Sequence, residues 1–277
     1  MIGFFGLLQA IADGFKLLSK ESVVPYSSDL FFFLLSPAIT FILALFSWAV
    51  IPFYDFVIIS DLNLSVFYIF FLSSVSVYSL IMSGWSSNSK YAFLGSLRSS
   101  AQLISYEIVM LLTILPLFLK AESINLITVV LSQNYSMNVF LFFPCFVLCF
   151  ITILAETNRV PFDLPEAESE LVSGYNVEYS SVGFVFFFLA EYSNIIMVSS
   201  FLVCIFFGGW LPLFTFFYLP PFFWFFFKLF FFLFFFIWIR ATLPRYRFDQ
   251  LMALCWKILM PLSLGFFFFF YFYLVKK

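Results

Sequence analysis

The chain has 277 residues, of which 64% are hydrophobic and 10% are charged, and it contains no His. Soluble domains typically carry about 25% charged residues, so this composition excludes an ordinary soluble globular domain. The absence of His excludes a His base and a His-ligated metal, and the net charge of -2 offers no basic surface for nucleic acid. These features leave an all-α protein that crosses a membrane several times.

The 49 Phe residues are the strongest bias in the composition. An AT-rich genome favours Phe codons and lipid-facing positions accept any large apolar side chain, so mutational bias explains this content better than a function in aromatic stacking. The first residues contain neither a basic, Ser-rich transit segment nor a signal peptide. We therefore expect an organelle-encoded protein that is made where it inserts. The four Cys lie in apolar surroundings and are expected to be core thiols.

Residues 4–20 have the pattern of an amphipathic helix. Apolar side chains recur at helical spacing, whereas Asp13, Lys16 and Lys20 lie elsewhere on the helical wheel. The apolar positions are Leu7, Leu8, Ile11, Phe15 and Leu18. A helix this short and polar cannot cross a bilayer, so we expect it to lie along the membrane surface, either as an anchor or as the wall of an opening into the bilayer.

Long apolar segments follow, each with room for one crossing of about 20 residues. Three carry no charge, namely residues 30–54, 62–89 and 123–155. Four carry a single ionisable residue each, namely residues 99–119, 183–207, 222–239 and 251–275. We therefore expect about seven transmembrane helices in a single membrane domain over residues 1–277, with the two termini on opposite sides.

Basic residues in the connections predict the orientation, because Lys and Arg are retained on the side from which insertion starts. Those on the side of the N-terminus are Lys16, Lys20, Lys90, Arg98, Arg159, Arg240, Arg245 and Arg247. Those on the other side are Lys120, Lys276 and Lys277. The N-terminus is therefore expected inside, which means the matrix side in a mitochondrion.

The connection at residues 156–181 is acidic and contains Arg159 as its one basic residue. Its acids are Glu156, Asp163, Glu166, Glu168, Glu170 and Glu178. A solvated acidic surface would explain them in the simplest way. Against this, two Pro residues stiffen the turn, and Glu166 and Glu170 fall on one helical face on the more basic side of the membrane, where these acids need partners.

Two more carboxyl groups lie within predicted spans, at Glu107 and Glu191. Each is eight or nine residues from the start of its segment, hence roughly 13 Å deep. Carboxyl groups at that depth are costly, usually face the protein interior, and mark proton or ion paths. Tyr106, Tyr192 and Asn194 beside them can support a proton relay. The alternative is a structural ion pair, for example with Lys228.

The polar residues of five segments identify a resemblance to subunit 1 of respiratory complex I, the mitochondrial NADH:ubiquinone oxidoreductase, and to its bacterial counterpart. The segment AETNRVPFDLPEAESELVSGYNVEY (155–179) resembles the signature loop of that family. The others are GLLQAIADGFKLLSKE (6–21), VYSLIMSGWSSNSKYAFLGSLRSSAQLISYE (77–107), FLAEYSNIIM (188–197) and WIRATLPRYRFDQLMALCWK (238–257). The resemblance therefore covers nearly the whole chain in order.

The resemblance implies a core membrane subunit that encloses a quinone tunnel with the peripheral arm and couples quinone reduction to proton translocation in the mitochondrial inner membrane. Ubiquinone would be the substrate, and flavin and iron–sulfur clusters would belong to partner subunits. The implied partners are the quinone-site and iron–sulfur subunits of the peripheral arm, other complex I membrane subunits and lipids. The chain should bind no cofactor itself, since it has neither four clustered Cys nor a Gly-rich nucleotide loop.

The resemblance also assigns expected roles to individual residues. Those matched to the quinone tunnel, its entrance and its loop are Asp13, Lys16, Arg98, Arg159, Phe162, Asp163, Phe188, Arg240 and Arg245. Those matched to the chain of acids that leads from the quinone chamber into the membrane are Glu107, Glu156, Glu166, Glu168, Glu170, Glu178 and Glu191.

One departure from the family pattern concerns the start of the chain. The family has a transmembrane helix and a basic Gly-Pro loop before the segment that begins here at Gly6, so we expect a separate short polypeptide to supply that helix.

Two other functions compete with the favoured one. A purely structural membrane anchor would not require Glu107 and Glu191, and a cation/proton antiporter would show broken-helix repeats with several intramembrane Lys and Glu. A membrane-bound hydrogenase subunit fits the composition less well.

Overall fold

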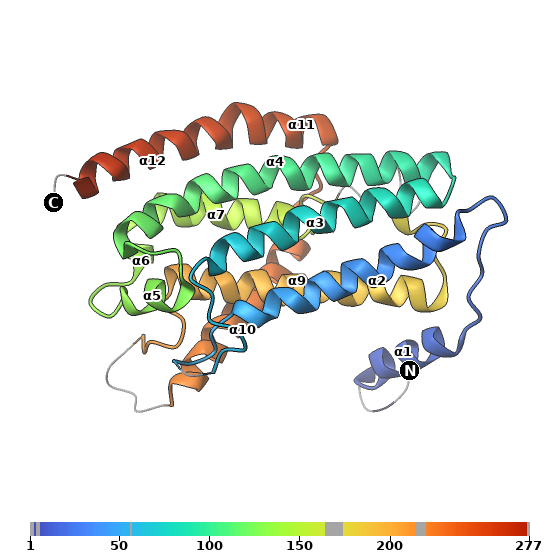
Figure 1. Cartoon of the computed structure of the whole chain (residues 1–277), viewed down its shortest axis with the longest axis horizontal. Coiled ribbons are helices and arrows are strands. Elements are labelled where there is room, and N and C mark those ends of the chain that lie inside the picture. Colours follow the sequence, from blue (N-terminus) through green and yellow to red (C-terminus); the bar gives the residue numbers. More distant parts are fainter. Residues whose placement is uncertain (1–2, 4–5, 56, 164–173, 214–219, 276–277) are drawn as a thin grey trace.

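The computed structural model describes residues 3, 6–55, 57–163, 174–213 and 220–275. Over these residues the protein is helical, with no β-strand. The long helices run side by side along the longest axis of the molecule, and α1 and the end of α12 lie toward opposite ends of that axis (Figure 1). This arrangement confirms the prediction of an all-α protein.

Helices long and apolar enough to cross a membrane account for most of the chain. Among the described residues there are six such segments, at Leu30–Val50, Ser65–Ser86, Lys90–Ala121, Ser181–Phe206, Pro221–Thr242 and Phe248–Leu274. They correspond to α2 (Leu30–Phe46) with η2 (Ser47–Val50), α3 (Ser65–Ser86), α4 (Lys90–Ala121), α9 (Ser181–Phe206), α10 (Pro221–Thr242), and α11 (Phe248–Ala253) with the π-helical turn η4 (Leu254–Leu259) and α12 (Met260–Val275). The prediction of a polytopic membrane protein is thus confirmed.

The seventh predicted crossing, residues 123–155, is divided into three helices. They are α5 (Leu126–Leu131), α6 (Asn138–Leu141) and α7 (Phe143–Glu156). The backbone leaves the helical conformation at Phe142 (φ -111°, ψ 37°), two residues before Pro144 in the first turn of α7. Helices α6 and α7 together cover residues 138–156, roughly 28 Å at 1.5 Å per residue, which is close to the thickness of a bilayer core.

Two side-chain amides stabilise the break before α6. The Gln133 amide donates to the carbonyls of Cys204 (2.9 Å) and Ile205 (3.0 Å), and the Asn138 amide donates to the carbonyl of Ile205 (2.9 Å). These carbonyls belong to the last turn of α9, where no further helical N–H group is present to pair with them. Hydrogen bonds to the end of α9 therefore stabilise the non-helical residues that interrupt this apolar segment.

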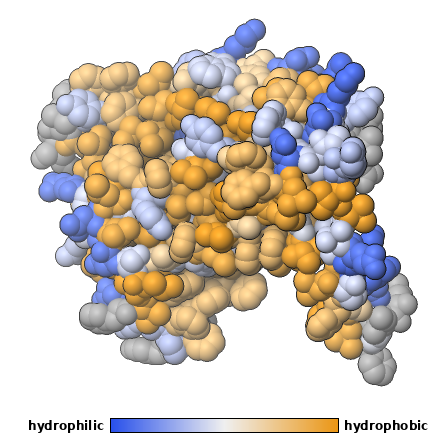
Figure 2. All heavy atoms as spheres, turned by 45° about the vertical axis from the view of Figure 1, so that its right-hand side comes forward, coloured by the Kyte–Doolittle hydropathy of each residue, from blue (hydrophilic) through white to orange (hydrophobic). Residues whose placement is uncertain are grey.

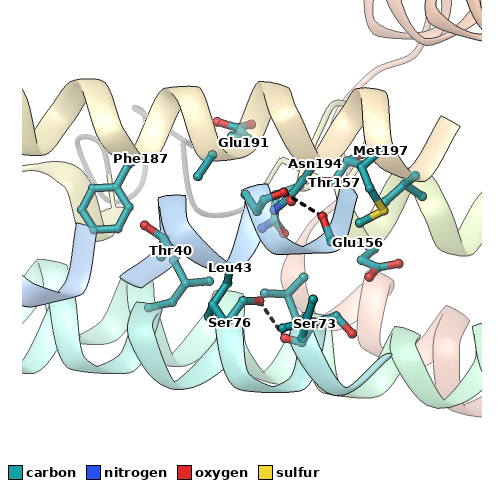
Figure 3. A pocket seen from close by; sticks show the side chains of 18 of the residues that line it. Thr40, Leu43, Ser73, Ser76, Glu156, Thr157, Phe187, Glu191, Asn194 and Met197 are labelled. Atoms are coloured by element: carbon teal, nitrogen blue, oxygen red, sulfur yellow. Dashed lines mark hydrogen bonds between the residues drawn. The ribbon is translucent and has the colours of Figure 1, made fainter. Parts of the chain in front are cut away.

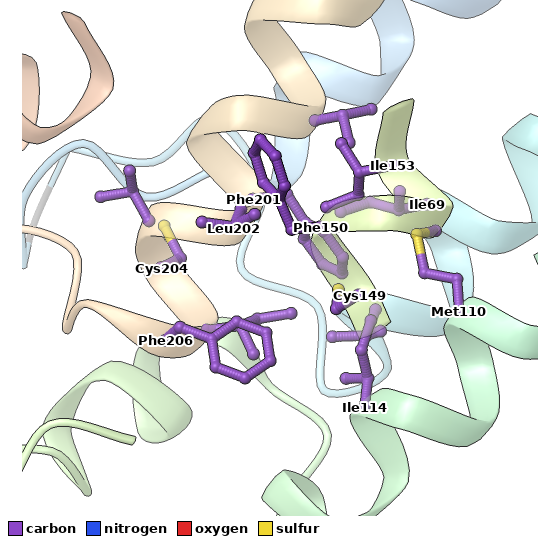
Figure 4. Close-up of a cluster of buried hydrophobic side chains, with 14 of the residues drawn as sticks. Ile69, Met110, Ile114, Cys149, Phe150, Ile153, Phe201, Leu202, Cys204 and Phe206 are labelled. Carbon is purple, nitrogen blue, oxygen red and sulfur yellow. The ribbon is translucent and has the colours of Figure 1, made fainter. Parts of the chain in front are cut away.

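Helix α7 lies at the centre of the main hydrophobic cluster. Figure 4 shows Cys149, Phe150 and Ile153 of α7 between side chains of α4 and α9. All four Cys are buried and free, in agreement with their expected role as core thiols. Where α3 and α4 cross, a Cβ on Gly84 would overlap the side chain of Ser96, so these helices need glycine to approach as closely as they do.

Helix α1 (Gln9–Ser19) lies at the side of the bundle, at the end where α2 begins (Figure 1). It covers residues 9–19 of the predicted amphipathic segment 4–20. Five apolar side chains of this segment are exposed, namely Leu7, Leu8, Ile11, Phe15 and Leu18. Its position on a membrane surface stays a prediction.

The exposed surface has the pattern expected for a membrane protein. On the face shown in Figure 2, hydrophobic residues cover the central region and hydrophilic residues gather toward the left and right margins. Many of the exposed aromatic residues belong to α10 and α12, including Phe230, Phe234, Phe268 and Phe272. Exposed positions on these helices therefore hold part of the Phe content.

Candidate functional site

The interior contains a cavity between α2, α3, α4, α9 and the end of α7, with both polar and apolar side chains on its walls. It has about 100 Å³ of room for the centres of water molecules. Figure 3 shows Thr40, Ser73, Ser76, Glu156 and Asn194 among the side chains on its walls. A cavity of this size, with several polar groups on its walls, has room for several waters.

Three carboxyl groups predicted as parts of a proton path line this single cavity: Glu107 of α4, Glu156 at the end of α7, and Glu191 of α9. They are separated by 35 to 84 positions in the sequence. The helical packing thus brings Glu107 and Glu191, which the sequence placed at similar depths, together with Glu156 of the acidic connection.

Glu107 is held by two hydroxyl groups from α3. Ser73 Oγ donates to Glu107 Oε1 at 2.8 Å, and Ser74 Oγ donates to the same oxygen at 2.7 Å. The carboxyl group is therefore directed toward α3, beside the cavity. Sequence reasoning missed these serines, although two adjacent hydroxyls in an apolar span are a signal that some polar group faces them.

Glu156 is the last residue of α7. Its Oε2 atom is buried and receives no hydrogen bond from the described residues. Because the cavity adjoins this carboxyl group, water can supply that hydrogen bond.

Glu191 forms an ion pair with the acidic connection. Arg159 Nε lies 3.0 Å from Glu191 Oε1, and the two side chains are 9% and 14% exposed. The guanidinium carbon of Arg159 also lies 4.7 Å from the ring centroid of Tyr192, within range of a cation–π interaction. Arg159 thus joins the segment after α7 to a carboxyl group on the cavity wall.

A second ion pair joins the same segment to the link between α10 and α11. Arg245 Nη2 lies 3.3 Å from Asp163 Oδ2; Asp163 is 5% exposed, whereas Arg245 is half exposed. The ring of Phe162 stacks on that of Tyr246, with centroids 5.6 Å apart, and Tyr246 N–H donates to the carbonyl of Pro161 at 3.0 Å. Phe162 and Asp163, predicted as residues of the tunnel loop, therefore contact the link that carries Arg245, which was predicted as a basic residue of the same tunnel.

Gln102 of α4 binds the segment after α7 at two points. Its amide nitrogen donates to the carbonyls of Ala155 (2.8 Å) and Phe162 (3.0 Å). Gln102 is fully buried, so these contacts hold Glu156 and Phe162 in place relative to α4. Sequence reasoning missed Gln102, which lies five residues before Glu107 on the same helix.

The remaining predicted site residues are not gathered at the cavity. Asp13 and Lys16 are exposed on α1, and Arg240 is exposed in the last turn of α10. Arg98 lies over the ring of Phe248, with its guanidinium carbon 5.8 Å from the centroid. Phe188 is half-buried on α9 and packs against Phe184, and Glu178 is half-buried. Glu166, Glu168 and Glu170 lie outside the described residues.

Lys228, considered as the partner of an intramembrane acid, has a different environment. Its ammonium group donates to the carbonyls of Phe207 (2.7 Å), Gly209 (2.9 Å) and Leu211 (2.6 Å). The residue is 2% exposed. It therefore caps the turn that ends α9, where helix carbonyls attract positive charge.

Comparison with known proteins agrees with this architecture. A model of the NADH dehydrogenase family matches residues 1–271. The chain is 53% identical over 268 residues to NADH-ubiquinone oxidoreductase chain 1 of Chondrus crispus, covering 96% of this chain and 82% of that protein. It is 56% identical over 270 residues to an NADH-quinone oxidoreductase subunit of Rickettsia peacockii (strain Rustic), covering 95% of this chain and 79% of that protein. The chain therefore belongs to the NADH dehydrogenase family, together with these two relatives.

Proposed function

We propose that the chain works as the membrane subunit of a proton-translocating NADH:quinone oxidoreductase that forms part of the quinone tunnel and couples quinone reduction to proton movement. The observation that carries this proposal is the convergence of Glu107, Glu156 and Glu191 on one internal cavity. Carboxyl groups within a membrane protein that face a polar cavity are typical of proton paths. A purely structural anchor would not require them.

The Arg159–Glu191 ion pair gives the loop a direct connection to this path. Reduction of a quinone takes up two protons and changes the charge near its headgroup. A charge change at the loop alters the position of Arg159 and hence the electrostatic environment of Glu191. Water in the cavity then connects Glu191 with Glu156 and Glu107, so that protons move between these groups without crossing apolar packing.

The tunnel residues are proposed on the same basis. Phe162 and Asp163 of the acidic connection lie together with Arg245 and Tyr246, and Arg159 lies four residues before Asp163 on the same segment. They would contribute an aromatic and charged rim to a quinone chamber shared with the peripheral arm. Arg98, Arg240 and Phe188 would line its approaches, and Asp13 and Lys16 would lie at the entrance. Glu178 and the acids at 166, 168 and 170 would extend the proton path toward the chamber.

The wider assembly follows from the same proposal. The substrate would be ubiquinone, and the partners would be quinone-site and iron–sulfur subunits, which with the flavin carry the redox centres, and other complex I membrane subunits. The exposed apolar side chains of α1 offer a surface to lipid or to a neighbouring chain of the assembly. The location would be the mitochondrial inner membrane, with the chain organelle-encoded and its basic connections on the matrix side.

Substitution of the cavity acids tests this function. In the assembled complex, Glu191→Gln and Glu107→Gln should each lower NADH:quinone reduction at least about tenfold, since a positioned proton-transfer group contributes about 10²–10⁴ in rate. Electron transfer from NADH to an artificial acceptor that bypasses quinone should stay normal. Glu122→Gln is the matched control, because Glu122 is exposed directly after the C-terminal end of α4 and does not line the cavity. Normal quinone turnover and a normal proton-to-electron ratio in both variants would refute the proposed path.

A further inference from the structure

Helix α1 is attached to the bundle through two consecutive serines at the start of α9. Ser180 Oγ accepts a hydrogen bond from Val23 N–H at 2.9 Å and lies 3.3 Å from the Val23 carbonyl, to which it can donate. Ser181 Oγ lies 2.6 Å from the carbonyl of Lys20 and 3.3 Å from that of Leu17. Both hydroxyl groups therefore bind the backbone at or just after the end of α1.

Ser181 supplies a cap that α1 does not supply for itself. The last carbonyls of a helix have no intrahelical partner, and the chain leaves α1 at Lys20 in an extended conformation (φ -76°, ψ 143°). Ser181 is 2% exposed and has a positive φ of 54°. A left-handed backbone is uncommon for residues other than glycine and persists where surrounding contacts hold it. Its hydroxyl is thereby aimed at the end of another helix.

The segment before the two serines is itself fixed to the bundle. The ring of Tyr179 stacks on that of Phe33 in α2, with centroids 4.1 Å apart and planes within 3°. Tyr179 Oη lies 2.9 Å from Ser36 Oγ. Burial raises the pKa of Tyr179, so its hydroxyl keeps the proton needed for hydrogen bonding. Ser180 and Ser181 therefore extend from a rigid base.

The rest of α1 is less firmly held. It packs chiefly against α9, and its apolar positions Ile11, Phe15 and Leu18 are exposed. In Figure 2 α1 forms a separate lobe at the lower right, with a notch between it and the body of the molecule. The orientation of this lobe depends strongly on the contacts made at its end.

We propose that Ser180 and Ser181 are positioning residues that fix α1 relative to α9 and thereby set the opening through which a long-tailed quinone passes from the bilayer. This role rests on the proposed function, in which α1 borders the entrance. A long isoprenoid tail must lie within the opening while the headgroup reacts, whereas a short-tailed quinone needs little of it. The two serines should thus affect the KM of long-tailed quinones and not the chemistry of quinone reduction.

A pair of substitutions with the same side-chain size separates the effect of the Ser180 hydroxyl from the effect of side-chain size. Ser180 has an extended backbone (φ -126°, ψ 164°) that suits β-branched residues. Ser180→Val removes the hydroxyl, whereas Ser180→Thr keeps it in a side chain of the same size as Val. Ser181→Ala removes the cap of α1. Ser199→Ala is the control on the same helix, because the Ser199 hydroxyl bonds within α9 to the carbonyl of Ile196.

Two measurements on the assembled complex in its membrane test the positioning role. Spin labels at Phe15→Cys and Leu189→Cys, both exposed, report the distance between α1 and α9, since the four native Cys are buried. Steady-state kinetics give KM and kcat for a long-tailed and a short-tailed ubiquinone. We expect Ser180→Val and Ser181→Ala to broaden the distance distribution and to raise the long-tail KM about threefold or more, the effect of losing one net hydrogen bond. Ser180→Thr and Ser199→Ala should match the wild type in both.

Distances that stay unchanged in Ser180→Val and Ser181→Ala would overturn the positioning role. A broadened distribution with an unchanged long-tail KM would overturn the link between α1 and quinone access. An equal loss of kcat with both quinones would also overturn it, because the serines would then act on the reaction itself. If the wild-type complex reduces no quinone, the proposed function fails, whereas the distances still report whether the serines hold α1.

Discussion

Arg159 lies between Glu191 and Tyr192, with its Nε 3.0 Å from the Glu191 carboxylate and its guanidinium carbon 4.7 Å from the Tyr192 ring centroid. One side chain of the acidic connection therefore reaches two consecutive residues of α9. Because Glu191 also lines the cavity, the position of this connection and the charge of the cavity wall are linked.

Removing Arg159 should leave a buried carboxylate without its partner. We expect Arg159→Gln to destabilise the packing of the segment after α7 by about 3–5 kcal/mol, the usual cost of breaking a buried ion pair. The double variant Arg159→Gln with Glu191→Gln should recover much of that stability but not the quinone reductase activity. Thermal unfolding of the purified complex, with activity measured in parallel, checks both expectations.

The control for this prediction is Lys90→Gln, which removes a positive charge from an exposed position at the start of α4. It should change neither stability nor activity. A double variant no more stable than Arg159→Gln alone would show that the two side chains do not act as a pair.

The two serines that hold Glu107 should act together. Both donate to the same carboxylate oxygen, so either one alone keeps the group directed toward α3. We expect Ser73→Ala and Ser74→Ala to have small effects and the double variant to reduce coupled quinone turnover by more than the product of the single effects. Steady-state rates and the proton-to-electron ratio in proteoliposomes measure this non-additivity.

Ser76→Ala is the matched control for that pair. Ser76 also lines the cavity, but its hydroxyl donates to the carbonyl of Ser73 within α3. If Ser76→Ala lowers turnover as much as the double variant, cavity polarity and not the orientation of Glu107 is the cause.

Lys228 should be required for assembly and not for proton transfer. Lys228→Met leaves three carbonyls at the end of α9 without their donor, at about 1–3 kcal/mol for each buried group that stays unsatisfied. We expect a low yield of assembled complex, whereas the complex that does assemble keeps a normal proton-to-electron ratio. Blue-native electrophoresis and proton-pumping assays distinguish these effects; an altered ratio at normal yield would place Lys228 in the proton path.

The sequence was sufficient for most of the membrane architecture, because charge-free apolar segments have few alternatives to transmembrane helices. It did not predict the division of residues 123–155 into three helices, because the hydropathy of this segment is continuous although the helix is interrupted. The polar residues Gln133 and Asn138 were the available signal for this break, since amides inside an apolar span need partners. Their partners on α9 are distant in the sequence and could not be predicted from spacing.

The candidate site was predictable in its residue types and less so in its contacts. Depth along a helix placed Glu107 and Glu191 at similar levels, and the structure brings both to one cavity with Glu156. The pairing of Arg159 with Glu191, and the bonds of Lys228 to carbonyls, depend on the direction of side chains after folding. A set of charged residues at similar depths does not specify which of them meet.

The close approach of Gly95 to Gly174 offers a further test of how the acidic connection is held. A Cβ on Gly95 would lie 2.8 Å from Gly174 Cα and 3.0 Å from Gly174 C, both of which are backbone atoms. Because these are backbone atoms and not the end of a flexible side chain, no side-chain rotation can relieve the overlap. We therefore expect Gly95→Ala to displace the chain at Gly174–Asn176 (η3), which leads into α9, and to cost about 1–3 kcal/mol through overpacking.

Gly265→Ala provides the matched control for Gly95→Ala. Gly265 lies within α12, and a Cβ there would meet no atom within 4 Å. Replacing glycine by alanine at an open helical position should stabilise the helix by up to about 1 kcal/mol. In the assembled complex, Gly95→Ala should lower both the thermal transition and quinone reduction, whereas Gly265→Ala should lower neither. Equal behaviour of the two variants would mean that the contact between α4 and the end of the acidic connection does not hold the site in place.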